Sequence, residues 1–195
     1  NLHKGKVEKK NRLFREEWNH ICQQVDKYKP HTLLLSTEHL FDGFTHGRGE
    51  KLKEVLAELS DDVEVICYVR RPSAYYLSLT QQILKSSAAM PAPKPVSYRG
   101  QLEQCISLFR RTHVVPFERE QLKGGDVVHD FFERFLPHEL LSVLDGWKGA
   151  RNETLTAESM AILQDYRLLH HGNKNREKVI DSKRLLVCVR ISEAL

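Results

Sequence analysis

Several features that mark common protein classes are missing from this sequence of 195 residues. No apolar run approaches the roughly 20 residues that a membrane-spanning helix needs, and the first residues lack the pattern of a signal peptide. The four cysteines are widely separated and form no CxxC pair, which argues against a zinc site and against a disulfide framework: Cys22, Cys67, Cys105 and Cys188. We therefore expect free thiols, a reducing cytoplasmic setting, no membrane span and no bound metal.

The glycine pattern of a nucleotide-binding P-loop is also missing. Glycines do cluster in residues 43–49, but this stretch lacks the Gly-Lys-Ser/Thr ending and follows no immediate strand. We interpret it as a flexible loop. A P-loop kinase is disfavoured for the same reason.

Positive charge is unevenly distributed, although the net charge is only +4. Residues 1–15 carry six Lys or Arg against one Glu, and residues 174–190 carry six against two acidic residues. Nucleic-acid binding would require aromatic side chains among the basic ones, and Phe14 is the only aromatic residue in these two stretches. We therefore expect no nucleic-acid partner, solvated basic faces, and a basic C-terminal helix or tail over 174–195.

Hydrophobic periodicity predicts alternating helices and strands. Short apolar runs predict strands at 32–38, 65–69 and 113–118, and helical spacing predicts helices at 1–29, 50–59, 72–85, 98–110, 126–135, 137–144 and 157–171. The proline-rich residues 86–97 predict a mobile loop. This order predicts a single α/β domain over 1–195, with a parallel sheet flanked by helices on both faces. Three strands are few for such a sheet, and the chain begins with Asn1, so we expect a first strand to be missing.

The stretch around Arg70 combines a strand with a helix and several polar side chains. An apolar run ends at Val69, and Pro72 suits the first position of a helix. Helical geometry places Ser78 on the side opposite the residues expected to face the sheet, Tyr76, Leu79, Thr80, Ile83 and Leu84. Arg70 and Ser78 are thus candidates for a phosphate site in the crevice above a parallel sheet. Simple capping and surface ion pairing remain the alternative.

The Arg-x-Pro pattern with a Ser six residues after the Pro resembles the 3′-phosphate-binding segment of sulfotransferases that use 3′-phosphoadenosine-5′-phosphosulfate (PAPS). Three further segments are similar to bacterial members of this family that act on saccharides or related acceptors: LLLSTEHL, VVPFEREQLKGGDVVHDFFERF and RNETLTAESMAIL. Together they cover roughly residues 32–170. The resemblance implies a P-loop NTPase-like sulfotransferase fold, PAPS as the sulfuryl donor without a metal, and a saccharide or other small acceptor. It places Arg70 and Ser78 on the 3′-phosphate.

One part of the family pattern has no counterpart here. The family holds the 5′-phosphosulfate with an N-terminal strand and a loop of the form Lys-x-Gly-Thr-Thr/Ser, and nothing in residues 1–31 matches it. We interpret this segment as lying upstream of Asn1. In the alternative, the chain lacks it and is a catalytically inactive nucleotide-binding or interaction module of the same fold.

A candidate general base lies at the carboxyl end of the predicted strand at 32–38. Sulfuryl transfer requires in-line placement, cationic stabilisation and a base for the acceptor hydroxyl. Glu38 follows two hydroxyl residues and matches a family glutamate, although a capping or ion-paired role stays open. Other candidates are His39 and His46 as bases, Arg71, Tyr75 and Lys85 as nucleotide or acceptor contacts, His170, His171 and Lys174 as a closure over the nucleotide, and Asn152, which matches a family position without a derived role.

Overall fold

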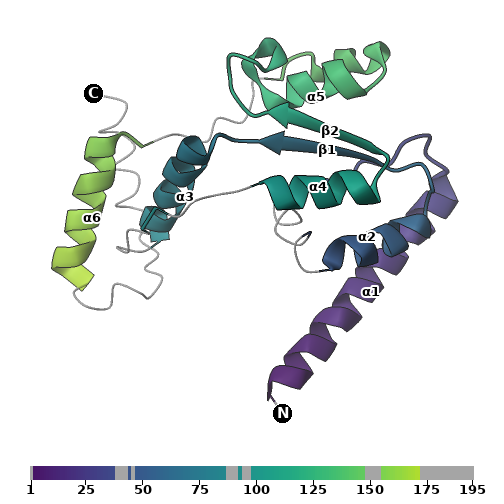
Figure 1. The fold of residues 1–195 in the computed structure, drawn as a ribbon, viewed down its shortest axis with the longest axis horizontal. Helices are drawn as coiled ribbons and strands as arrows, with labels where there is room; N and C mark the ends of the chain where they lie inside the picture. Colours follow the sequence, from purple (N-terminus) through teal and green to yellow (C-terminus); the bar gives the residue numbers. More distant parts are fainter. Residues whose placement is uncertain are drawn as a thin grey trace. The chain divides into compact units, whose positions relative to one another are not determined.

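The computed structural model describes residues 2–37, 44, 47–86, 92–93, 98–147 and 155–171. In chain order (Figure 1) its elements are α1 (Leu2–Tyr28), α2 (Arg48–Ala57), β1 (Glu64–Val69), α3 (Pro72–Ser86), α4 (Arg99–Leu108), β2 (Arg111–Pro116), η2 (Lys123–Gly125), α5 (Val127–Phe135), η3 (His138–Leu144) and α6 (Ala157–His171). The chain forms two compact units, residues 1–66 with 98–113 and residues 67–97 with 114–195.

The described strands form one small parallel sheet. β1 pairs with β2 (Figure 1), and the boundary between the two units passes through both strands. Strands at 65–69 and 113–118 were predicted, and both are confirmed with shifts of one or two residues. A continuous apolar run is typical of a strand that is buried on both faces, yet the side chains of β1 after Glu64 are only half-buried. A sheet of only two strands buries few of its own side chains. The structure is therefore α/β with a small sheet.

The strand predicted at 32–38 is wrong over the part that the structure describes. Residues 32–37 have no regular secondary structure, and Leu33, Leu34 and Leu35 are all exposed. Three consecutive leucines lack the β-branched side chains that favour a pleated strand, and a strand also requires a partner for its backbone. The sheet that the structure describes therefore has two of the three predicted strands.

Local capping signals explain where the helices begin and end. α3 begins at Pro72, as predicted, and α1 ends before Pro30 with Lys29 at a positive φ of 43°. Asp126 caps α5, because its Oδ1 accepts hydrogen bonds from the Val128 and His129 amides at 2.9 and 3.2 Å. The predicted helices at 50–59, 98–110 and 157–171 are confirmed as α2, α4 and α6, and the one at 137–144 is a 3₁₀ helix.

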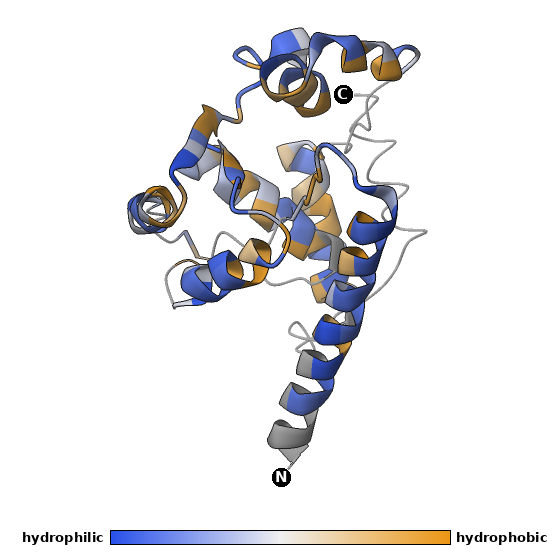
Figure 2. Cartoon of the chain, turned by 90° about the vertical axis from the view of Figure 1, so that its right-hand side faces the viewer, coloured by the Kyte–Doolittle hydropathy of each residue, from blue (hydrophilic) through white to orange (hydrophobic). Residues whose placement is uncertain are grey.

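The first unit is held by contacts of α1 and α4 with α2 and its C-cap. Hydrophilic residues line most of α1 (Figure 2), but its Trp18 is buried and donates an Nε1 hydrogen bond to Glu58 Oε2 at 2.9 Å. The start of α2 lies so close to α4 that a Cβ on Gly49 would stand 2.5 Å from Leu108 Cδ1. Glycine at this position therefore permits the close helix contact.

The second unit contains α3 packed against α6, and α5 packed against η2 and η3 (Figure 1). Leu84 of α3 and Leu163 of α6 are fully buried. The predicted inner face of α3 is correct for Thr80 and Leu84 but wrong for Leu79, which is exposed. The buried stripe of α3 is narrow because this helix packs chiefly against α6. The prediction had instead assumed that a broad sheet covers α3.

Some predictions concern residues outside the described parts. In the predicted loop 86–97, Ser86 ends α3 and residues 92–93 have no regular secondary structure. The other residues of this loop lie outside the described parts, and so does the predicted C-terminal helix or tail at 174–195. Among the described residues, Cys22, Cys67 and Cys105 are not joined by a disulfide. No helix in the described ranges combines the length and apolarity needed to cross a membrane.

Candidate phosphate-binding site

The two arginines that follow β1 have different surroundings. Arg71 forms an ion pair with Glu118, with 2.7 Å between Nε and Oε1. Arg70 is half-buried, and its guanidinium carbon lies 4.5 Å from the centre of the Phe117 ring. Within the described residues, the Arg70 side chain has no hydrogen bond and no carboxylate partner. Arg70 is therefore held by an aromatic face, and no described residue uses its side-chain N–H donors.

The start of α3 adds backbone donors beside this arginine. The Tyr75 amide donates to the Arg71 carbonyl at 2.8 Å, which closes the first helical turn directly after Arg70. The first amides of a helix have no intrahelical acceptor and carry the positive end of the helix dipole. Pro72 contributes no N–H, so Ser73 and Ala74 supply these donors. The end of β1 thus combines a guanidinium group with a helix N-terminus.

Ser78 lies further along the same helix. Its side chain is half-buried, and the described part of the chain gives its hydroxyl no hydrogen-bond partner. Ser78 is six residues beyond Pro72, which corresponds to about 9 Å along the helix axis. Arg70 and Ser78 can share one ligand only if the arginine side chain extends along α3 and the ligand bridges the remaining gap.

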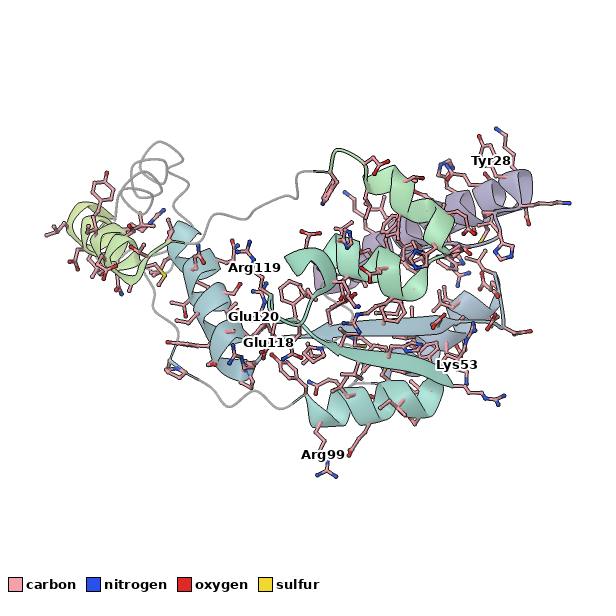
Figure 3. All side chains as sticks on the ribbon, turned by 90° about the horizontal axis from the view of Figure 1, so that it is seen from above. Tyr28, Lys53, Arg99, Glu118, Arg119 and Glu120 are labelled. Atoms are coloured by element: carbon pink, nitrogen blue, oxygen red, sulfur yellow. The ribbon has the colours of Figure 1, made fainter. Side chains whose placement is uncertain are left out.

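The turn after β2 supplies the ring beneath Arg70. The Phe117 amide donates to the Val69 carbonyl at 2.8 Å and so extends the pairing beyond β2. The amides of Gln121 and Leu122 then donate to the Glu118 carbonyl at 2.8 and 3.1 Å. Figure 3 labels Glu118, Arg119 and Glu120 where this turn leaves β2. We refer to residues 117–125 as the β2–α5 turn.

A buried carboxylate lies at the other end of this turn. Asp130 of α5 is 0% exposed; its Oδ1 accepts from the Lys123 amide and from Arg134 Nε, and its Oδ2 accepts from the Tyr68 hydroxyl, each at 2.7 Å. Desolvation acts to raise the pKa of Asp130, but the hydrogen bonds from Lys123, Arg134 and Tyr68 outweigh it and lower that pKa. Burial, and next the bond to Asp130, raise the pKa of Tyr68. Tyr68 is thus a neutral donor to an ionised Asp130.

Sequence reasoning found Arg70 and Ser78 but missed Phe117 and Asp130. A signal for Asp130 did exist, because it is an acidic residue among the apolar residues of α5, four positions before Arg134. No comparable signal identifies Phe117, since its position under Arg70 depends on the pairing of β1 with β2.

Among the other predicted site residues, the structure describes the side chains of Arg71 and Tyr75. Arg71 is engaged by Glu118, and Tyr75 is an exposed residue of α3. Glu38, His39, His46, Asn152 and Lys174 lie outside the described residues, as do the side chains of Lys85, His170 and His171. The candidate base Glu38 therefore stays a prediction from sequence.

Comparisons with protein-family models, with curated proteins and with solved structures found no match for this chain. The assignment of a function therefore rests on the geometry around Arg70 and on the sequence segments described above.

Proposed function

We propose that Arg70, Ser78 and the first turn of α3 bind the 3′-phosphate of PAPS. In this proposal the chain catalyses transfer of the sulfuryl group from PAPS to a hydroxyl or amine of an acceptor such as a saccharide. The observation that carries this proposal is the contrast between the two arginines. Arg71 is neutralised by Glu118 at 2.7 Å, whereas Arg70 stacks on Phe117 without a described carboxylate partner.

Stacking on an aromatic ring prepares Arg70 to bind a phosphate. A guanidinium fork matches two phosphate oxygens, and a charge-assisted pair of this kind is roughly twice as strong as a neutral hydrogen bond. The ring of Phe117 restricts the side chain before the ligand arrives, which lowers the ordering cost of binding. The half-buried position also reduces screening by water. These features favour a phosphate group as the ligand of Arg70.

The proposed fold contains a larger parallel sheet than the two strands that the structure describes. Each strand is followed along the chain by a helix, β1 by α3 and β2 by α5, which is the repeating unit of a parallel sheet covered by helices. A strand followed directly by Arg70 and by a helix start is the arrangement in which open α/β folds bind ligands. These units support a P-loop NTPase-like sulfotransferase fold.

The proposed roles separate binding from chemistry. PAPS supplies a sulfuryl group on a phosphate leaving group. Arg70 and Ser78 hold the nucleotide in place, and we assign to Glu38 the removal of the proton from the acceptor hydroxyl.

The proposal is tested by calorimetric titration of two matched variants, Arg70→Ala and Arg71→Ala, with adenosine 3′,5′-bisphosphate. Arg70→Ala should weaken binding by about 10- to 100-fold, because a hydrogen bond to a charged group contributes about 1.5–3 kcal/mol. Arg71→Ala removes an ion pair between an exposed arginine and the half-buried Glu118, so the affinity for the nucleotide should change by less than about fivefold.

Far-ultraviolet circular dichroism checks that both variants keep their helices. Equal affinities for Arg70→Ala and the parent chain would refute the assignment of Arg70. Nucleotide binding without sulfuryl transfer to any of a panel of hydroxyl and amine acceptors would favour the inactive nucleotide-binding module.

A further inference from the structure

The turn that carries Phe117 is fixed at its far end by the buried carboxylate of Asp130. Asp130 Oδ1 accepts the Lys123 amide at 2.7 Å, within the β2–α5 turn itself. Arg134 strengthens this attachment, because its Nε binds Asp130 Oδ1 at 2.7 Å while its Nη2 donates to the Gln121 carbonyl at 3.2 Å. The second half of the turn is therefore tied to α5 through one carboxylate and its partner arginine.

The same carboxylate also holds β1, the strand that ends directly before Arg70. Its Oδ2 accepts the Tyr68 hydroxyl at 2.7 Å, two residues before Arg70. The Tyr68 ring meets the Phe117 ring edge to face, with 6.3 Å between the ring centres. Phe117 thus lies between Tyr68, which Asp130 holds, and Arg70, whose guanidinium carbon stands 4.5 Å from the ring centre.

We propose that Asp130 is a positioning residue for Arg70, because it fixes both Tyr68 and the β2–α5 turn and thereby holds Phe117 under the guanidinium group. The inference deepens the proposed function and rests on it for the nature of the ligand. Asp130 does not touch that ligand. It acts through Tyr68, Lys123 and Phe117.

A carboxylate suits this position better than other side chains. Three donors converge on two oxygens, and one of them is a charged guanidinium group. An asparagine offers one acceptor oxygen and adds two N–H donors, one of which would face Tyr68 or Arg134. An apolar side chain would leave the Lys123 amide and the Tyr68 hydroxyl without an acceptor in a buried place.

The test compares Asp130→Asn with Asp126→Ala, a variant of a second carboxylate at the start of α5. Asp126 caps the helix through Val128 and His129 but does not bind the strand or residues 117–123 through its side chain. The first readout is the proton chemical shift of the Arg70 Nε–H in isotopically labelled protein, since a proton above an aromatic ring is shifted upfield. The second is the affinity for adenosine 3′,5′-bisphosphate.

We expect Asp130→Asn to move the Arg70 signal downfield, toward that of an unstacked arginine, and to weaken binding about tenfold, because the guanidinium fork loses its preset orientation. Asp126→Ala should lower stability and leave both readouts unchanged. Should Asp130→Asn fail to fold, Arg134→Ala takes its place, since the Arg134 side chain is 36% exposed whereas Asp130 is fully buried, and a smaller change in the same direction is expected.

Two outcomes would overturn the inference: a folded Asp130→Asn with the parent's Arg70 shift and affinity, or equal changes in Asp126→Ala. If the parent chain binds no nucleotide, the proposed function fails, while a downfield shift in Asp130→Asn alone still supports the positioning role.

Discussion

A strand was predicted for two apolar stretches of this chain, but only one of the two predictions is confirmed. Residues 65–69 form most of β1, which pairs with β2 and is held through Tyr68 and Val69. Residues 33–35 are as apolar, yet they are exposed and outside any described strand. The difference shows that an apolar run becomes a strand only when a partner takes up its backbone groups and side chains.

The same comparison shows that the two halves of the proposed site, around Arg70 and around Glu38, rest on different kinds of support. Each apolar run was expected to deliver a functional residue at its end, Arg70 after β1 and Glu38 after residues 32–37. Arg70 has a defined environment made by Phe117 and the start of α3. The nucleotide-binding half of the site therefore rests on contacts, while the catalytic half rests on sequence.

The largest expected effect comes from placing a charged side chain at a buried position of β2. Val115 of β2 is 7% exposed, and Val115→Lys should lower the free energy of unfolding by about 3 kcal/mol or more, because an unpaired charge would be buried. Its neighbour Val114 points to the opposite face and is exposed, so Val114→Lys is the matched control, with an expected loss below about 1 kcal/mol. Urea unfolding measures both. Similar losses in the two variants would contradict the burial of Val115.

An intermediate effect should depend on pH through Asp130. Since its folded-state pKa is depressed, this carboxylate stabilises the fold fully above its unfolded-state value, about 4, and the contribution is lost as the pH falls through the depressed pKa. Asp130→Asn lacks this contribution. The difference in unfolding free energy between the parent and Asp130→Asn should therefore be largest at neutral pH and shrink below about pH 4. Urea midpoints measured between pH 7 and pH 2 check this, and a constant difference would mean that Asp130 has no depressed pKa.

The smallest expected effect lies in the exposed leucines. Leu34 is 57% exposed, and Leu34→Lys should change the free energy of unfolding by less than about 0.5 kcal/mol. An exposed apolar segment favours association with other chains, so the variant should also scatter less light at high concentration. A loss above about 2 kcal/mol would show that residues 32–37 pack against other parts of the protein.

Local signals made much of the fold predictable, whereas long-range pairing did not. Pro72 marks a helix start that the structure confirms, and Asp126 and Thr156 are residues of types that favour helix caps and stand at the starts of α5 and α6. The strand at 32–38 was wrongly predicted because no local pattern reveals whether a partner strand is present. Arg70 was predictable as the residue at a strand end. Asp130 was not connected to it, because its bond to Tyr68 joins residues 62 positions apart.

The central claim is that the end of β1 recognises a 3′-phosphate, and calorimetric titration of the parent chain with two nucleotides tests it most directly. Adenosine 3′,5′-bisphosphate should bind with a Kd in the micromolar range. Adenosine 5′-monophosphate, which lacks the 3′-phosphate, should bind at least about tenfold more weakly, because a charge-assisted contact with Arg70 is lost. Equal affinities for the two nucleotides, or no binding of either, would contradict the account.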